Sequence, residues 1–131
     1  MTEDILARAR AASVDGQLSC ASAHRIAAEL GLTPRQVGIA VNRDDSLRFY
    51  RCQMGFFGYG NKAEGKHRIV LPAENVPDDV REALEGVTHD GRIACADAWR
   101  VADDLEYPYL AIANVIEQLG YRVKPCQLGC F

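Results

Sequence analysis

The sequence predicts a mainly α-helical α+β protein that is built from two similar units in tandem. Two observations support this prediction. A stretch of the first half recurs 75 residues later, and the apolar residues of each copy keep helical spacing between short strand-like segments. We expect the two units to pack into one globule with pseudo-twofold symmetry.

The repeat is clearest in two places. When the chain is shifted by 75 positions, residues 15–21 (DGQLSCA) lie over residues 90–96 (DGRIACA). After a single-residue gap, residues 52–57 (CQMGFF) lie over residues 126–131 (CQLGCF). Identities at cysteine, glycine and small positions on both sides of one gap indicate a duplication. The predicted units are residues 1–57 and residues 78–131, joined by residues 58–77.

Composition bounds the class of protein. The chain has 131 residues, of which 48% are hydrophobic, so it can bury a core of its own. No apolar stretch approaches the roughly 20 residues that cross a bilayer, and the first residues lack the basic and apolar regions of a signal peptide. We therefore expect a cytoplasmic protein with no membrane contact. Its five cysteines are then expected to be reduced rather than joined in a disulfide framework.

Charge is distributed unevenly along the chain. Residues 1–75 hold 10 basic and 8 acidic side chains, a balance of +2, whereas residues 76–131 hold 5 and 10, a balance of −5. Together these give the net charge of −3. The two units therefore cannot present the same face to a polyanion, and only the first suits nucleic acid.

Local signals place the helices and strands. Thr33 as N-cap, Pro34 at the first helical position and Gln36 three residues after the cap form a capping box. Thr2 is expected to cap the first helix, and Pro77 to occupy the first turn of its counterpart. The predicted elements of the first unit are a helix over 3–13, a strand over 17–20, a second helix whose apolar face is Ala23, Ile26, Ala27 and Leu30, a third helix from Thr33, and a strand over 47–52. Their counterparts are a helix from Pro77, a strand over 92–95, helices from Ala98 to Leu105 and from near Pro108, and a strand over 121–126.

This order of elements is that of a winged helix, and residues 23–42 resemble the helix-turn-helix motif of DNA-binding regulators. Ala27 allows the two helices to approach, Gly31 allows a positive φ in the turn, and Val37 fills the angle between the helices. The resemblance implies tandem winged-helix-like units. In each, the first strand pairs with the strand after the third helix, which brings Cys20 near Cys52 and Cys95 near Cys126. The repeated Cys-Gln-x-Gly-x-Phe ending also resembles segments of small uncharacterised prokaryotic proteins.

The resemblance implies a transcriptional regulator that binds double-stranded DNA through the third helix of the first unit. A glycine-rich, aromatic and basic loop follows Phe57 and is expected to grip phosphates as a wing, or else to be a solvated linker. The candidate DNA contacts are Arg35, Gln36, Asn42 and Arg43 on the helix, and Lys62, Lys66 and Arg68 in the loop.

The second unit departs from this pattern. Glu106 stands where the first unit has its turn glycine, and the third helix carries no Lys or Arg. We expect this unit to stabilise the first, to self-associate or to bind a protein partner. Trp99, Tyr107 and Tyr109 are candidates for an aromatic contact surface, and core packing is the commoner role of such residues.

Three cysteines of the second unit suggest an alternative role. Cys95, Cys126 and Cys130 can hold zinc or an iron–sulfur cluster, or can sense oxidation. Against this, Cys126 and Cys130 are spaced Cys-x3-Cys rather than Cys-x2-Cys, and the first unit has Phe56 where Cys130 stands. We expect buried structural cysteines and no cofactor, with the metal or redox site as the alternative.

Catalysis has little support in the sequence. His24, His67 and His89 are scattered, with no acid or nucleophile at a recognisable spacing, and no phosphate-binding glycine loop opens a helix. Each histidine is interpreted as a surface residue or a hydrogen-bonded core residue, and the chain is predicted not to be an enzyme. The alternative to a DNA-binding regulator is a non-catalytic interaction or accessory module, metal- or redox-linked through its cysteines.

Overall fold

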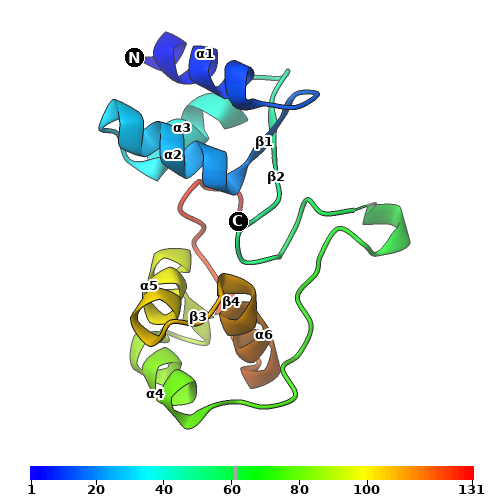
Figure 1. Ribbon diagram of the computed structural model, residues 1–131, viewed down its shortest axis with the longest axis vertical. Coiled ribbons are helices and arrows are strands. Elements are labelled where there is room, and N and C mark those ends of the chain that lie inside the picture. Colours follow the sequence, from blue (N-terminus) through cyan, green and yellow to red (C-terminus); the bar gives the residue numbers. More distant parts are fainter. Residues whose placement is uncertain (61) are drawn as a thin grey trace.

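The computed structural model describes residues 1–60 and 62–131, with only the backbone described for Lys62. Helices dominate it, which confirms the mainly helical α+β class (Figure 1). Among the described residues no helix combines the length and the apolar character that crossing a bilayer requires. The elements in chain order are α1 (Thr2–Ala12), β1 (Gln17–Ser19), α2 (Cys20–Leu30), α3 (Pro34–Asn42), β2 (Arg48–Tyr50), the short 3-10 turn η1 (Lys62–Glu64), α4 (Asp78–Val87), β3 (Arg92–Ile93), α5 (Cys95–Leu105), α6 (Tyr109–Leu119) and β4 (Arg122–Val123).

The same order of elements, helix, strand, helix, helix and strand, occurs twice. The two halves lie one above the other, with α1 to α3 in the upper half and α4 to α6 in the lower half (Figure 1). Each half closes with a parallel two-stranded ladder, in which Leu18 pairs with Phe49 and Ile93 pairs with Val123. This is the strand pairing that the winged-helix resemblance implies. The resemblance itself and the pseudo-twofold symmetry stay predictions.

Several element ends differ from those predicted. The Ile5 N–H donates to the Met1 carbonyl (3.1 Å), so α1 begins at Thr2 and Met1, not Thr2, is its N-cap. Pro77 likewise precedes α4 as N-cap instead of lying in its first turn. The strands are shorter than expected because Arg51 turns the chain with a φ of 50°, and Pro125 offers no N–H to a ladder.

The helix-turn-helix region forms as the local signals predict. Thr33 and Gln36 make both hydrogen bonds of the capping box at the start of α3, and Gly31 ends α2 with a φ of 67°. Val37 is fully buried in the core of the first half. In the second half Glu106 adopts the same left-handed conformation, with a φ of 60°, at a cost of roughly 1–2 kcal/mol relative to glycine.

Each half completes the core of the other half. We call residues 52–57 and 126–131, which follow the last strand of each half, the exchanged loops. Met54 belongs to the first half but is fully buried in the core of the second, whereas Leu128 belongs to the second half and is 2% exposed in the core of the first. In Figure 1 the C-terminal segment (red) rises from the lower half to α2 and α3. The two halves are therefore interlocked through their cores.

Gly38 on α3 allows one of these exchanges. A Cβ atom at this position would overlap the backbone carbonyl group of Leu128, so any side chain here would push the exchanged loop away. Gly38 and its neighbour Val37 are both buried, which places this side of α3 against the loop. Gly38 therefore serves the packing of the exchanged loop against α3.

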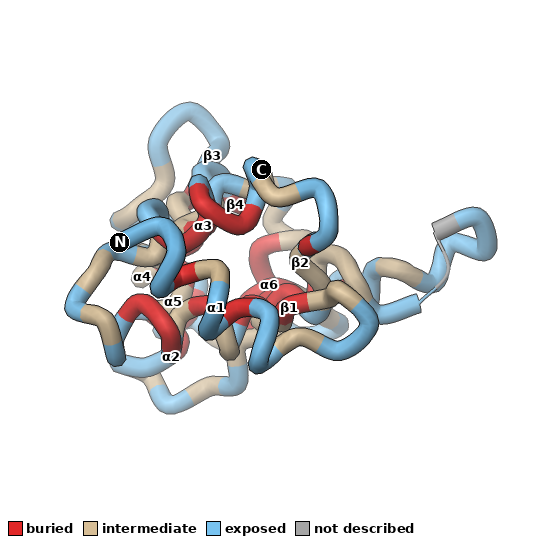
Figure 2. The backbone as a smooth tube through the Cα atoms, turned by 90° about the horizontal axis from the view of Figure 1, so that it is seen from above, coloured by how far each residue is buried: buried red, intermediate tan, exposed pale blue. Residues whose placement is uncertain are grey.

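An arm projects from the body between the two halves. It contains η1, and the side chains around Glu64 and Lys66 are exposed (Figures 1 and 2). The Ile69 N–H donates to the Gly55 carbonyl (2.9 Å) and the Tyr59 N–H donates to the His67 carbonyl (3.1 Å). These bonds join the two limbs of the arm into an irregular hairpin.

We predict that Gly38→Ala lowers the free energy of unfolding by about 1–3 kcal/mol, because the added methyl group has no space beside the Leu128 backbone. Urea unfolding followed by circular dichroism measures this loss. The matched control is Gly86→Ala in α4, where an added Cβ meets nothing within 4 Å. This control should raise stability by about 0.4–1 kcal/mol through helix propensity. A Gly38→Ala protein as stable as wild type would contradict the packing described here.

Candidate nucleic-acid interface and cysteine cavity

The exposed side of α3 carries the basic residues that the sequence singled out. Arg35, Ile39 and Arg43 follow one another at intervals of four residues and form one exposed stripe. Ile39 is 41% exposed, which is unusual for a large aliphatic side chain. An open groove of about 350 Å³ borders this stripe, lined by Arg35, Ile39, Asn42, Arg43, Leu128 and Gly129.

Two of the four predicted helix contacts already have partners within the protein. Gln36 Oε1 accepts a hydrogen bond from the Thr33 N–H (2.9 Å), so its amide is held at the start of α3. Asn42 Nδ2 donates a long hydrogen bond of 3.5 Å to the Leu128 carbonyl. Arg35 and Arg43 remain as the cations of this face, because no carboxylate of the described residues forms an ion pair with either.

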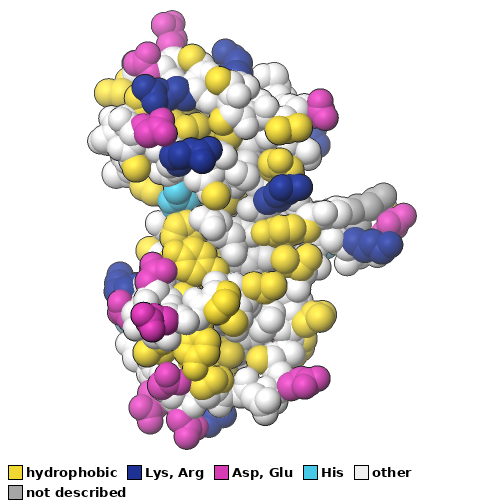
Figure 3. Space-filling view, viewed as in Figure 1, with side chains coloured by type: hydrophobic (Ala, Val, Ile, Leu, Met, Phe, Trp, Pro, Cys, Tyr) yellow, Lys and Arg dark blue, Asp and Glu magenta, His cyan; other side chains and the backbone are white. Residues whose placement is uncertain are grey.

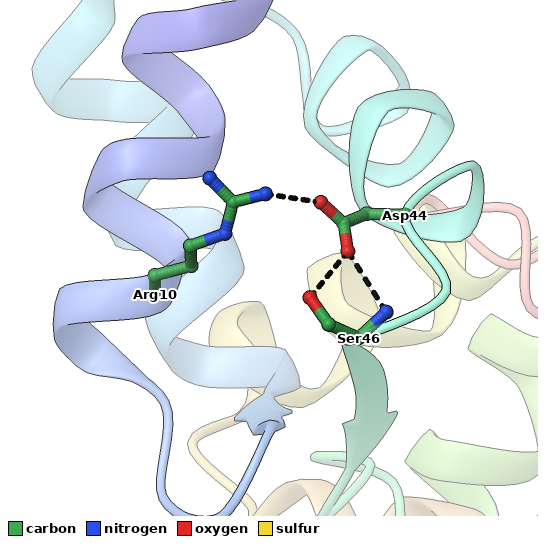
Figure 4. Close-up of polar contacts among 3 residues, drawn as sticks. All are labelled: Arg10, Asp44 and Ser46. Atoms are coloured by element: carbon green, nitrogen blue, oxygen red, sulfur yellow. Dashed lines mark hydrogen bonds and ion pairs between the residues drawn. The ribbon is translucent and has the colours of Figure 1, made fainter.

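Two acidic residues of the first half form ion pairs with α1. Arg10 forms an ion pair with Asp44 (2.6 Å), which follows α3 directly, and Arg8 forms one with Glu29 on α2 (2.7 Å). The Asp44 carboxylate also accepts hydrogen bonds from the Ser46 hydroxyl and N–H (Figure 4). Those hydrogen bonds, with a smaller contribution from Arg10, hold the pKa of Asp44 below its usual value.

The basic residues of the arm are separate from the α3 stripe. Lys66 lies 3.6 Å from Glu64 on the arm itself, with both side chains exposed. Arg68 forms an ion pair of 2.5 Å with Glu117 of α6 and also lies over the Phe56 ring. The side chain of Lys62 falls outside the described residues. Of the predicted wing contacts, Lys66 therefore lies at the projecting end and Arg68 at the base.

The corresponding helix of the second half is covered. The Leu71 N–H donates to Asn114 Oδ1 and the Ala73 N–H donates to the Asn114 carbonyl, both at 3.0 Å. With the Arg68–Glu117 pair, these bonds fix the segment between the halves along α6. On the face shown in Figure 3 the charged side chains of the lower half are mostly acidic. The second half thus offers no open basic helix among the described residues.

All five cysteines line one enclosed cavity where the two halves meet. Its volume is about 10 Å³, the lower limit for holding one water molecule. Strand pairing brings together the cysteines of each half, as the sequence predicted, but the exchanged loops then bring both sets to the same place. Cys20 and Cys52 were not expected beside Cys95, Cys126 and Cys130. The signal that could have suggested this grouping is that the cysteines occupy equivalent positions in the two repeats.

The predicted three-cysteine metal site stays a prediction. Among the described residues, no three histidine, cysteine, aspartate or glutamate side chains are arranged so that they could hold a metal ion. Burial raises the pKa of Cys20 and of Cys95 to about 12, so both stay protonated at neutral pH. Whether zinc or an iron–sulfur cluster binds stays the alternative that the sequence left open.

Cys126 differs sharply from the other thiols. The neighbouring Cys130 thiol and the backbone N–H groups of residues 128–130 hold the pKa of Cys126 below the usual value for a thiol. The nearest N–H, that of Leu128, lies 3.4 Å from Cys126 Sγ. Cys52 has the equivalent backbone donors, but burial outweighs them and raises its pKa. Phe56 stands where Cys130 would supply the additional donor.

The histidines and aromatic residues fall into different environments. His24 lies 4.4 Å from the Trp99 ring, which in turn stacks on Tyr109, and desolvation lowers the pKa of His24. His67 is half-buried, and its Nδ1 is buried with no hydrogen-bond partner among the described residues. Trp99 packs against both cores.

Comparison of the chain with models of protein families, with curated proteins and with solved structures gave no match.

We predict that the rate at which iodoacetamide alkylates Cys126 rises and levels off at a lower pH than for free cysteine, because the thiolate is the reactive form and the pKa of Cys126 is lowered. Peptide mapping after timed labelling measures the rate at each cysteine. Cys130→Ala removes the strongest donor and should move the midpoint upward, toward the ordinary thiol value near 8.5. A wild-type rate that still climbs through pH 8.5 would refute the low pKa of Cys126.

Proposed function

We propose that this chain is a DNA-binding regulator that contacts double-stranded DNA through α3. The supporting observation is the exposed stripe of α3, on which Arg35 and Arg43 flank Ile39 and have no carboxylate partner among the described residues. An arginine without an internal partner has its full hydrogen-bonding capacity available for an anion or a base.

The three residues suit different parts of a duplex. The second helix of a helix-turn-helix enters the major groove with its N-terminal residues toward the bases, so Arg35, in the first turn of α3, faces a guanine edge. Ile39 lies one turn further along, where an aliphatic side chain contacts the methyl group of thymine. Arg43 follows the last turn and contacts a phosphate, which positions the protein without reading sequence.

The arm supplies a second contact. Its irregular hairpin projects from the body, and Lys66 lies on its exposed part with only a long, solvent-exposed ion pair to Glu64. A pair of this kind contributes little and yields readily to a phosphate. Arg68 has a different role in this proposal, because its pair with Glu117 fixes the base of the arm to α6.

The second half acts as a scaffold in this proposal. Its balance of five more acidic than basic residues disfavours contact with a polyanion, and the connecting segment covers α6. The exchanged loop of this half lies against the buried side of α3 and borders the groove beside Arg35. The second half thus holds α3 in place without touching the duplex.

We predict that the protein binds a short random-sequence duplex at about 50 mM salt and that the affinity falls steeply by about 200 mM. Arg35→Ala and Arg43→Ala should each weaken binding by about tenfold, within the usual range of about 1–3 kcal/mol for such contacts. Arg43→Ala should also reduce the salt slope by about one, because a phosphate contact is lost. Fluorescence anisotropy measures both quantities.

The matched control is Arg81→Ala. Arg81 is an exposed arginine of α4 with no ion pair among the described residues, and it lies in the acidic half. Its removal changes net charge by the same amount but should leave the affinity unchanged. Absence of binding at low salt, or an equal loss for Arg81→Ala, would overturn the proposal and favour a protein-interaction module instead.

A further inference from the structure

The second exchanged loop surrounds one sulfur atom with hydrogen-bond donors. The Cys126 N–H donates to the Phe131 carbonyl (2.8 Å), and the Gly129 N–H donates to the Cys126 carbonyl (3.1 Å), so the chain closes on itself. Within this closed loop the Leu128 N–H points at Cys126 Sγ from 3.4 Å. A concave set of backbone N–H groups stabilises negative charge, which on Cys126 means a thiolate.

The same loop carries a second thiol, that of Cys130. Cys126 and Cys130 line the same small cavity and are both half-buried, whereas Cys20, Cys52 and Cys95 are buried. The two sulfurs can therefore approach bonding distance within one loop. The first exchanged loop provides a natural comparison, because Cys52 has a similar set of backbone donors but Phe56 in place of the second thiol.

Cys130 is the member of the pair that borders an open groove. Cys130 and Phe131 line an open groove of about 660 Å³, which Arg48 and Asn42 also line. On the other side Cys126 and Cys130 line the enclosed cavity that contains the three buried thiols. Cys126 does not line this groove, but it lies in the same loop and is half-buried, whereas Cys20, Cys52 and Cys95 are buried. A small polar oxidant therefore reaches this loop more readily than the three buried thiols.

We propose that Cys126 and Cys130 form a reactive dithiol site for hydroperoxides, with Cys126 as the nucleophile and Cys130 as the resolving thiol. The Cys126 thiolate attacks one peroxide oxygen, the O–O bond breaks, and the alcohol or water leaves after taking a proton. This leaves a sulfenic acid on Cys126. The Cys130 sulfur then attacks the Cys126 sulfur, and the hydroxyl group leaves with the Cys130 proton as water.

The electrons balance over these two steps. Two thiols lose two electrons and two protons in forming one disulfide, and the hydroperoxide gains both in becoming an alcohol and water, or two waters. A small-molecule dithiol restores the reduced pair by exchange through a mixed disulfide. The proposal does not depend on DNA binding, because each step uses only the loop and the oxidant.

The test treats reduced full-length protein with one equivalent of hydrogen peroxide and measures intact mass and peptide masses. We expect the loss of two hydrogen atoms, located in the peptide that contains residues 126–131. In Cys130→Ser the sulfenic acid should persist and be trapped by dimedone on Cys126. Cys52→Ser, the matched control in the first exchanged loop, should react at the wild-type rate.

Three results would overturn the proposal. The first is a Cys126–Cys130 pair that stays reduced under conditions that oxidise free cysteine. The second is dimedone trapping on Cys20 or Cys95 instead of Cys126. The third is a metal ion that remains bound to anaerobically purified protein at one per chain and blocks alkylation of Cys126, because the thiols would then be ligands.

Discussion

The close approach of Leu128 to Gly38 is the contact on which the rest of the structure depends. Because glycine has no side chain, the backbone of the second exchanged loop lies directly on α3 and Leu128 enters the core of the first half. Met54 makes the reciprocal entry into the other core. These two insertions hold the halves together, place α3 relative to the second half, and gather the cysteines in one cavity. Both candidate sites are therefore consequences of one packing arrangement.

Local features of this fold were predictable because their causes are local. The capping box of Thr33 and Gln36, the turn at Gly31 and the burial of Val37 depend on residues a few positions apart. The exchange of loops was not predictable in this way. Leu128 is apolar and is therefore expected to be buried, but the sequence does not say which of the two similar cores it enters. Only the three-dimensional packing decides that.

The candidate sites show the same division. The exposed stripe with Arg35 and Arg43 follows from helical spacing alone. Gln36 was expected to contact a base, and its side-chain oxygen accepts a hydrogen bond from the Thr33 N–H at the start of α3. From the expected strand pairing, the sequence predicted one pair of neighbouring cysteines in each half. The exchanged loops bring both pairs to the same cavity. Sequence reasoning therefore succeeds for residues of one element and fails where two halves contribute.

The division of the core between the halves also determines how the molecule behaves when its backbone is broken. A protease that cuts the exposed arm near Gly65 separates a fragment carrying Met54 from a fragment carrying Leu128. Each fragment then lacks one side chain of its own interior and holds the one that the other lacks. Fragment complementation follows, since reassociation of the two pieces restores both interiors at once, and neither piece alone presents a closed surface to water.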